Sequence, residues 1–154
     1  MKLTENFTLK ELTYTNPEIF KRFGVQNIPN EEVIENLKNL AINILQPIRN
    51  HFKVPIIISS GYRSPEYNKI IGGAHGSQHT KGEAVDIDMD GTKVTNKEIF
   101  DYIIENLQFD QIIWEFGDNK NPDWIHISYN KNNRRMVTRA IRKNGKTQYQ
   151  IIPI

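Results

Sequence analysis

Three residues of the sequence have the chemical types of a catalytic metal site: His79, Asp86 and His126. Two imidazoles and one carboxylate suit Zn²⁺, and a catalytic zinc needs three protein ligands with a fourth position left open. Gly82 lies between His79 and Asp86, where a glycine lets the backbone turn tightly enough to aim both side chains at one point. Because the chain has no cysteine, any metal must be held by histidine and carboxylate. These residues indicate metal-assisted hydrolysis.

Hydrolysis at such a metal also needs a base that takes a proton from the attacking water. Asp123 is the preferred candidate, because it closely precedes His126 and follows Pro122 in a loop that can curl back beside the metal. Glu115 ends a predicted strand that faces the same region, and it is a rival base or a hydrogen-bond partner for a ligand histidine. Arg63 could stabilise the negative charge of the transition state or bind a substrate carboxylate.

Each of these signals also has a purely structural explanation. A histidine within a strand is more often structural than metal-binding, and an aspartate beside a proline is more often a turn former. Arg63 could equally pair with a surface acid. His75 lies close to the predicted site, and we favour a plain loop residue over a substrate contact. The metal-site hypothesis therefore rests on the combination of these residues in one order along the chain.

The predicted secondary structure supplies rigid elements from which these side chains can converge. Apolar residues recur at three- and four-residue steps after Asn30, which is typical of an amphipathic helix, and Pro47 predicts a kink or an early end. Alternating polar and apolar residues predict strands around Asp86 and His126. The predicted helices cover residues 31–51 and about 95–107, and the predicted strands cover 56–58, 84–89, 109–116, 124–129, 136–142 and 147–152. This order predicts an α+β fold, an antiparallel sheet with helices packed mainly on one side.

A chain of 154 residues is long enough for one domain with a substantial core. We expect a single domain over residues 1–154, in which residues 1–30 form an ordered cover and residues 131–154 form a β-hairpin through Asn144-Gly145. The net charge of +2 suits an anionic partner without identifying one. The sequence has neither a signal-peptide core nor an apolar run of membrane-spanning length, so we expect a protein made in the cytoplasm without membrane insertion.

Three stretches form a larger pattern: SSGYRS from Ser59 to Ser64, SQHTKGEAVD from Ser77 to Asp86, and DWIH from Asp123 to His126. Their order resembles the D-alanyl-D-alanine carboxypeptidase-like zinc peptidases. This family includes VanY-type D,D-carboxypeptidases, D,D-dipeptidases and phage L-alanyl-D-glutamate endolysins. The resemblance covers about residues 4 to 140, and it implies a hedgehog/DD-peptidase-like fold.

The resemblance also implies a role for each candidate residue. Asp123 would be the general base, and Arg63 would stabilise the carbonyl oxygen or the oxyanion. Ser77 and Gln78 would line the substrate side. Some family members have glutamate where this chain has Asp123, so the shorter side chain makes its role depend on the position of the loop. The implied ligands of one Zn²⁺ are His79, Asp86 and His126.

The implied activity is zinc-dependent hydrolysis of a peptide bond in peptidoglycan stem peptides, as a D-Ala-D-Ala carboxypeptidase or an L-Ala-D-Glu endopeptidase. The lack of a signal peptide favours a phage- or prophage-associated protein that acts on the cell wall after lysis or as part of a phage particle. The alternative is a non-catalytic virion or wall-binding module that retains the fold. Nucleic-acid binding through the basic C-terminal residues is a weaker option, and we expect no nucleic-acid partner. The sequence leaves the cleaved bond and the oligomeric state open.

Overall fold

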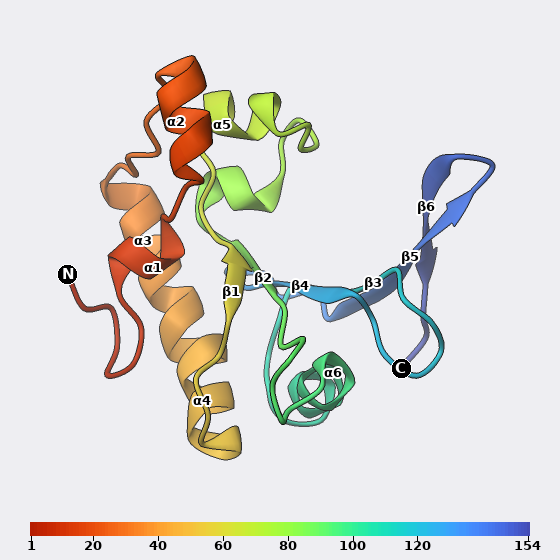
Figure 1. Cartoon of the computed structure of the whole chain (residues 1–154). Coiled ribbons are helices and arrows are strands. Elements are labelled where there is room, and N and C mark those ends of the chain that lie inside the picture. Colours follow the sequence, from red (N-terminus) through yellow and green to blue (C-terminus); the bar gives the residue numbers. More distant parts are fainter.

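The computed structural model describes residues 1–154, and its centre is a six-stranded sheet with the strand order β1-β2-β4-β3-β5-β6 (Figure 1). The strands are β1 Ile58–Ser60, β2 Ala84–Ile87, β3 Gln111–Glu115, β4 Trp124–Ser128, β5 Met136–Lys143 and β6 Lys146–Ile151. The α+β fold agrees with the prediction, but the sheet is not wholly antiparallel, because β3 and β5 run parallel. The last residues of β4 pair with the first residues of β3, and the first residues of β5 pair with the first residues of β3 on its other side. Strands β3 and β5 therefore start at the same edge of the sheet and run in the same direction.

Helices α3 (Glu31–Leu40) and α4 (Gln46–Phe52) form one long helix through a π-helical segment at Ala41–Leu45. The helix therefore continues past Pro47, where the sequence predicts a kink or an end. A proline donates no N–H and its ring crowds the carbonyl one turn earlier, and the wider π turn beside it accommodates both effects. Asn30 caps the helix as predicted, because its side chain accepts a hydrogen bond from the Val33 N–H at 2.9 Å.

Helix α6 (Asn96–Asn106) begins with a capping box between Thr95 and Glu98. Figure 1 shows α6 on the opposite side of the sheet from α5 (Pro65–Ile70). The side chain of Asn96 ties α6 to the sheet, because its amide donates to the Asp123 carbonyl at 3.1 Å and its Oδ1 accepts from the Met89 N–H at 2.7 Å. This helix therefore fixes the start of β4.

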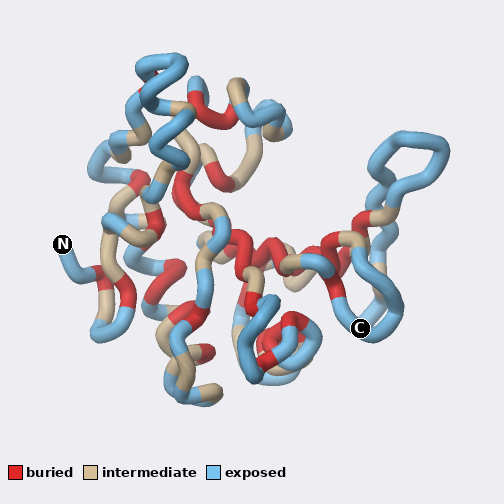
Figure 2. The backbone as a smooth tube through the Cα atoms, in the orientation of Figure 1, coloured by how far each residue is buried: buried red, intermediate tan, exposed pale blue.

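The two faces of the sheet differ because successive strand residues point to opposite sides. One face is apolar and packs against α3, α4 and α6 in the main core, where the central strands are buried (Figure 2). Its strand residues in that core are Val85, Ile87, Ile112, Trp114, Ile125, Ile127 and Val137. The other face carries Asp86, Glu115 and His126, so the polar residues of the predicted site share one side of the sheet.

The N-terminal residues form two short helices: α1 (Leu9–Leu12) lies near β1 at the edge of the sheet, and α2 (Pro17–Phe23) lies further from the sheet, beside α5 (Figure 1). Gly61 makes a close approach to this segment, because a Cβ atom there would lie 2.2 Å from the Leu12 carbonyl oxygen. The Tyr62 N–H donates to that same oxygen at 2.7 Å. The side chain of Asn27 donates to the Tyr62 carbonyl and accepts from the Ser64 N–H. Residues 1–30 are thus hydrogen-bonded to the stretch that follows β1.

Strands β5 and β6 form a C-terminal hairpin that extends away from the helices (Figure 1). Its turn is Asn144-Gly145, and both residues have positive φ angles, of 53° and 74°, as the asparagine–glycine pair favours. Strand β6 is exposed along its whole length. Among the helices of the structure, none has the length and apolar character needed to cross a bilayer.

Candidate metal centre

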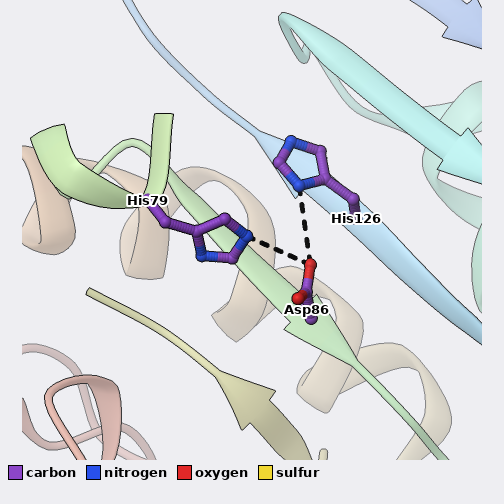
Figure 3. Close-up of side chains that lie close together, drawn as sticks. All are labelled: His79, Asp86 and His126. Carbon is purple, nitrogen blue, oxygen red and sulfur yellow. Dashed lines mark hydrogen bonds and ion pairs between the residues drawn. The ribbon is translucent and has the colours of Figure 1, made fainter. Parts of the chain in front are cut away.

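His79, Asp86 and His126 lie together on the polar face of the sheet (Figure 3). Asp86 on β2 and His126 on β4 are direct cross-strand partners, so both side chains leave the sheet on the same face. His79 comes from the 3₁₀ helix Gln78–Lys81, which ends at Gly82 with a φ of 73°. Asp86 Oδ1 is 3.2 Å from His79 Nε2 and 3.5 Å from His126 Nδ1. One potential ligand atom from each residue lies within 4.8 Å of the other two.

The two histidines have nitrogen atoms available for a metal. His79 Nδ1–H donates to the Gly61 carbonyl at 2.8 Å, so a neutral ring keeps its lone pair on Nε2, the atom that faces Asp86. In His126, Nδ1 is the ring nitrogen that faces Asp86 Oδ1, at 3.5 Å, while the buried Nε2 points away from that carboxylate (Figure 3). His79 Nε2 and His126 Nδ1 therefore converge on the same carboxylate oxygen. This donor set fits Zn²⁺.

Asp86 is the negative charge at the centre of the cluster. Burial raises the pKa of the Asp86 carboxyl, but the neighbouring His79 and His126 outweigh that effect and hold the pKa well below its usual range. The carboxyl is therefore ionised, which is the form that binds a metal.

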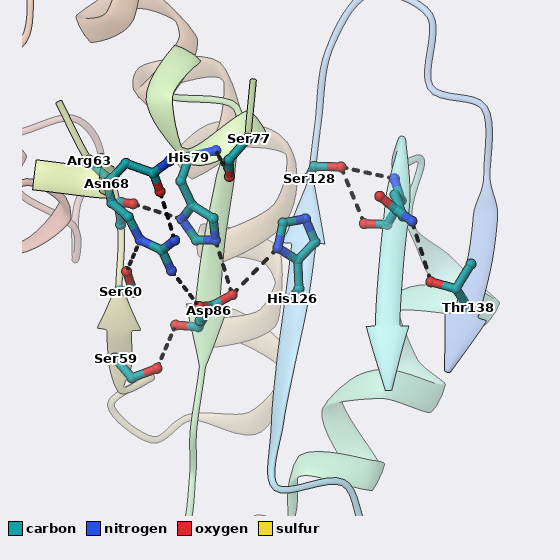
Figure 4. Close-up of polar contacts among 12 residues, drawn as sticks. Ser59, Ser60, Arg63, Asn68, Ser77, His79, Asp86, His126, Ser128 and Thr138 are labelled. Carbon is teal, nitrogen blue, oxygen red and sulfur yellow. Dashed lines mark hydrogen bonds and ion pairs between the residues drawn. The ribbon is translucent and has the colours of Figure 1, made fainter. Parts of the chain in front are cut away.

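Arg63 lies beside this carboxylate and is held by three side-chain contacts (Figure 4). Its Nη2 is 3.3 Å from Asp86 Oδ2, its Nε donates to Ser60 Oγ at 2.9 Å, and its Nη1 donates to Asn68 Oδ1 at 3.2 Å. Asn68 is itself buried, and its amide donates to the Ala74 carbonyl at 2.9 Å. The guanidinium is therefore fixed between the carboxylate and the loop that follows α5.

His75 and Ser77 lie on that loop and Gln78 begins the 3₁₀ helix, and all three line the same cavity as the potential ligands. Ser77 Oγ accepts from the His79 N–H at 3.2 Å and so caps the 3₁₀ helix that carries His79. Gln78 Nε2 donates to Asp110 Oδ2 at 2.8 Å. His75 is exposed on the rim. Ser77 and Gln78 therefore also hold the backbone and side chains around the site in place.

The two candidate bases lie in different surroundings. Asp123 precedes β4 with an exposed side chain, and it is not among the residues that line the cavity. Its backbone is fixed on both sides: its N–H donates to the Glu115 carbonyl at 2.9 Å, and its carbonyl accepts from Asn96. The carboxylate of Asp123 is thus exposed, on a backbone that is held in place.

Glu115 ends β3 as the cross-strand partner of Trp124, and it lines the cavity together with His126. The residue is only 7% exposed. Burial and, second, the negative charge of Asp86 raise the pKa of the Glu115 carboxyl to about 7, although His126 lowers it in part. A general base works best when its pKa lies near the operating pH. Glu115 is therefore a buried carboxyl on the cavity wall with a pKa near neutral.

The cavity, of about 980 Å³, also contains residues that the sequence did not single out. Asp110 has a fully buried side chain whose two oxygens accept from Arg134 Nε at 3.0 Å and Nη2 at 2.7 Å, which closes one end of the cavity. At another side, the hairpin contributes Arg142, Thr147 and Tyr149. Only the strand register places the three hairpin residues at the cavity, because nothing in their local sequence distinguishes them from a hairpin that faces solvent.

Comparison with known proteins agrees with this geometry. The chain matches the family described as Peptidase M15 over residues 5–128, a region that contains β1 to β4 and all three potential ligands. The comparison with curated proteins gave no match. Because the family match covers most of the sequence, the chain belongs to the Peptidase M15 family and is a metallopeptidase.

Proposed function

We propose that this metallopeptidase uses one zinc ion to hydrolyse a peptide bond in peptidoglycan stem peptides, as a D-Ala-D-Ala carboxypeptidase or an L-Ala-D-Glu endopeptidase. The observation that carries the proposal is the buried cluster of His79, Asp86 and His126, in which one nitrogen of each histidine faces the Asp86 carboxylate, inside an open polar cavity. A cavity of about 980 Å³ lined mostly by polar side chains suits an extended, polar peptide rather than a small apolar ligand.

His79, Asp86 and His126 would hold the zinc ion. Bound Zn²⁺ would supply a Lewis acid that polarises the scissile carbonyl and makes water more acidic. The Gly61 carbonyl keeps the His79 ring in one tautomer, and Arg63 keeps the Asp86 carboxylate in one orientation. These contacts fix the ligand side chains before substrate arrives, which reduces the reorganisation that catalysis requires.

Glu115 takes the role of general base in this proposal, in preference to Asp123. Its carboxyl lies buried on the cavity wall beside His126, where it would accept a proton from the attacking water and return it to the leaving amine. The position of Asp123 in the DWIH stretch favours it as the base. That role stays a prediction, and separate substitutions of Glu115 and Asp123 test it.

Arg63 is proposed to stabilise the negative charge that develops on the carbonyl oxygen. A guanidinium has five N–H donors, and three of those on Arg63 are engaged by Ser60, Asn68 and Asp86. Two donors on a rigidly held group that lines the cavity remain for the substrate. Ser77 and Gln78 line the same cavity and are proposed to contact the peptide.

Digestion of purified muropeptides with the zinc-loaded protein, followed by mass spectrometry, tests the proposal. Loss of one terminal alanine identifies a carboxypeptidase, and release of whole stem fragments identifies an endopeptidase. The His126→Ala variant is the control for a contaminating hydrolase. If elemental analysis finds no zinc after loading, or if no muropeptide changes mass, the proposed function is wrong.

A phage- or prophage-associated role in wall degradation is part of the proposal, and it rests on the sequence alone. The competing function is a non-catalytic virion or wall-binding module. Such a module would bind purified cell walls equally well with or without Glu115 and would release no peptide. Wall binding without release, unchanged in Glu115→Gln, would favour that alternative.

A further inference from the structure

We infer that Arg142, on the C-terminal hairpin, is a specificity-determining residue that binds a free carboxylate of the substrate peptide. The inference rests on the proposed function, because it assigns a substrate feature to the same cavity. It concerns a part of the chain that lies beyond residues 5–128, the region that matches the peptidase family. The hairpin therefore adds to the cavity residues that lie outside the matched region.

The strand register places the hairpin on the same face as the metal centre. Glu115 on β3 is paired with Ala140 on β5, and Ala140 is paired with Tyr149 on β6. Two residues further along, Arg142 is paired with Thr147, so both belong to that face. Ala140, between Glu115 and Tyr149 in this cross-strand row, is small and fully buried. Its side chain therefore leaves the space between Glu115 and Tyr149 open to the cavity. The hairpin in Figure 1 thus extends the polar face of the sheet, and Arg142, Thr147 and Tyr149 all line the cavity.

Arg142 is the cationic residue at this end of the cavity that has no acidic partner. The cavity contains four Lys or Arg residues, namely Arg63, Lys81, Arg134 and Arg142. Arg63 is paired with Asp86, and Arg134 with Asp110. Lys81 belongs to the 3₁₀ helix Gln78–Lys81, and its charge acts on the Glu83 carboxyl. The Arg142 side chain makes no hydrogen bond or ion pair within the chain, so its donors are free for a ligand.

An aromatic platform holds this guanidinium in place. Arg142 Cζ lies 5.0 Å from the centre of the Phe116 ring, and that ring lies 5.5 Å from the Trp124 ring. Phe116 has a positive φ of 57°, which is unusual for a bulky residue, and its N–H is fixed by the Ala140 carbonyl at 3.0 Å. Strained backbone of this kind persists where it positions a functional group. Stacking covers one face of the guanidinium and leaves its edge available for a planar, bidentate contact with a carboxylate.

Stem peptides offer two such groups, the α-carboxylate of the D-glutamate residue and the C-terminal carboxylate. Three synthetic stem pentapeptides separate them: one with both carboxylates free, one with the D-glutamate carboxylate amidated, and one with the C-terminus amidated. For Arg142→Ala we expect KM to rise about tenfold on the peptide with both groups free, the scale of one lost charge-assisted hydrogen-bonded contact. The effect should fall below about twofold on one of the two amides, and that amide identifies the bound carboxylate.

Lys143→Ala is the matched control, because it removes the same charge from the next residue of β5, on the opposite face of the exposed hairpin. It should leave KM within about twofold on every peptide, since distant surface charges contribute little. The inference is overturned if Arg142→Ala changes KM equally on all three peptides, changes it on none, or behaves like Lys143→Ala.

Binding to the metal-free protein separates this inference from the proposed function. Isothermal titration in the presence of a chelator measures the Kd of each pentapeptide without hydrolysis. If wild-type protein hydrolyses no stem peptide but Arg142→Ala still weakens binding of the free carboxylate about tenfold, the proposed function fails and the inference stands. If hydrolysis occurs and Arg142→Ala changes neither KM nor Kd, the inference fails and the proposed function stands.

Discussion

The ligand wall of the cavity, formed by His79, Asp86 and His126, is buried and held by hydrogen bonds, whereas the hairpin wall, formed by Arg142, Thr147 and Tyr149, is exposed. In the ligand wall, both nitrogens of His79 and both oxygens of Asp86 have protein contacts. In the hairpin wall, the Arg142 guanidinium contacts only an aromatic ring. The family match includes the first wall and ends before the second. A metal centre tolerates little displacement of its ligands, so the rigid wall suits it, and the exposed wall is free to contact the rest of a substrate.

Loss of a ligand from the rigid wall should have the largest effect. His126→Ala removes one of the three potential ligands, and we expect it to abolish stoichiometric zinc binding and hydrolysis together. The effect should exceed the roughly 10–100-fold loss typical of removing a hydrogen-bond partner of a ligand. Elemental analysis and hydrolysis assays measure the two quantities. A variant that retained one zinc per chain would show that the rigid wall is not the metal site.

Substitution of the two candidate bases should give the next largest effect. Glu115→Gln keeps the size of the side chain but cannot accept a proton, so kcat should fall by about 10²–10⁴-fold. Asp123→Asn should leave kcat within a few-fold, because its side chain is exposed and outside the cavity. Zinc content should be unchanged in both. The reverse result would assign the base to Asp123 and remove β3 from the catalytic wall.

A methyl group at Gly61 should test whether the N-terminal segment stiffens the ligand wall. In Gly61→Ala the new Cβ would lie 2.2 Å from the Leu12 carbonyl, so the backbone that accepts from His79 must move. We expect a loss of about 1–3 kcal/mol in the free energy of unfolding, as for overpacked sites, together with weaker zinc binding. Gly76→Ala is the control, because its Cβ would meet nothing within 4 Å. It should lower stability through its positive φ without changing zinc affinity.

An effect on stability alone, without a change in zinc binding, is expected at the end of the cavity that Asp110 and Arg134 close. The hydrogen bonds from Arg134 lower the pKa of the buried Asp110 carboxyl to about 2, against a raising effect of burial. Because the folded-state pKa lies below the ordinary value of 3.8, this pair stabilises the fold above about pH 4, and the contribution is lost as the pH falls toward 2. Arg134→Ala should therefore cost about 1–3 kcal/mol at pH 6 and progressively less in acid.

Urea unfolding of Arg134→Ala and wild-type protein between pH 2 and pH 7 measures this difference. Lys131→Ala, an exposed cation of the same loop, is the control. A constant difference across the pH range would mean that Arg134 acts through packing rather than through Asp110.

The three potential ligands could be predicted because each lies in a local pattern that fixes its direction. Asp86 and His126 sit on the polar positions of alternating strands, so pairing of the strands was enough to bring them together. Arg63 was predicted near the site, but its contact with Asp86 depends on how the residues after β1 fold back, which no local pattern encodes.

The placement of Glu115 and Asp123 relative to the cavity depends on strand register, which the sequence does not state. Both residues are acidic, and both lie near the ends of strands that pair with each other. The pairing of Glu115 with Trp124 puts Glu115 on the polar face, while the backbone of Asp123 is held by Asn96 of a distant helix. The sequence predicts an antiparallel sheet, whereas β3 and β5 are parallel. Their relative direction depends on the edge of the sheet at which β5 begins, and no local sequence pattern gives that edge.

The peptide group that joins Gly61 to Tyr62 has a spectroscopic consequence. Its carbonyl accepts from His79, and its N–H donates to the Leu12 carbonyl, so one rigid plane connects the imidazole to the N-terminal segment. Hydrogen bonds in series polarise one another. The Tyr62 amide resonance should therefore shift when His79 binds a metal. This single NMR signal would report occupancy of the site without any substrate.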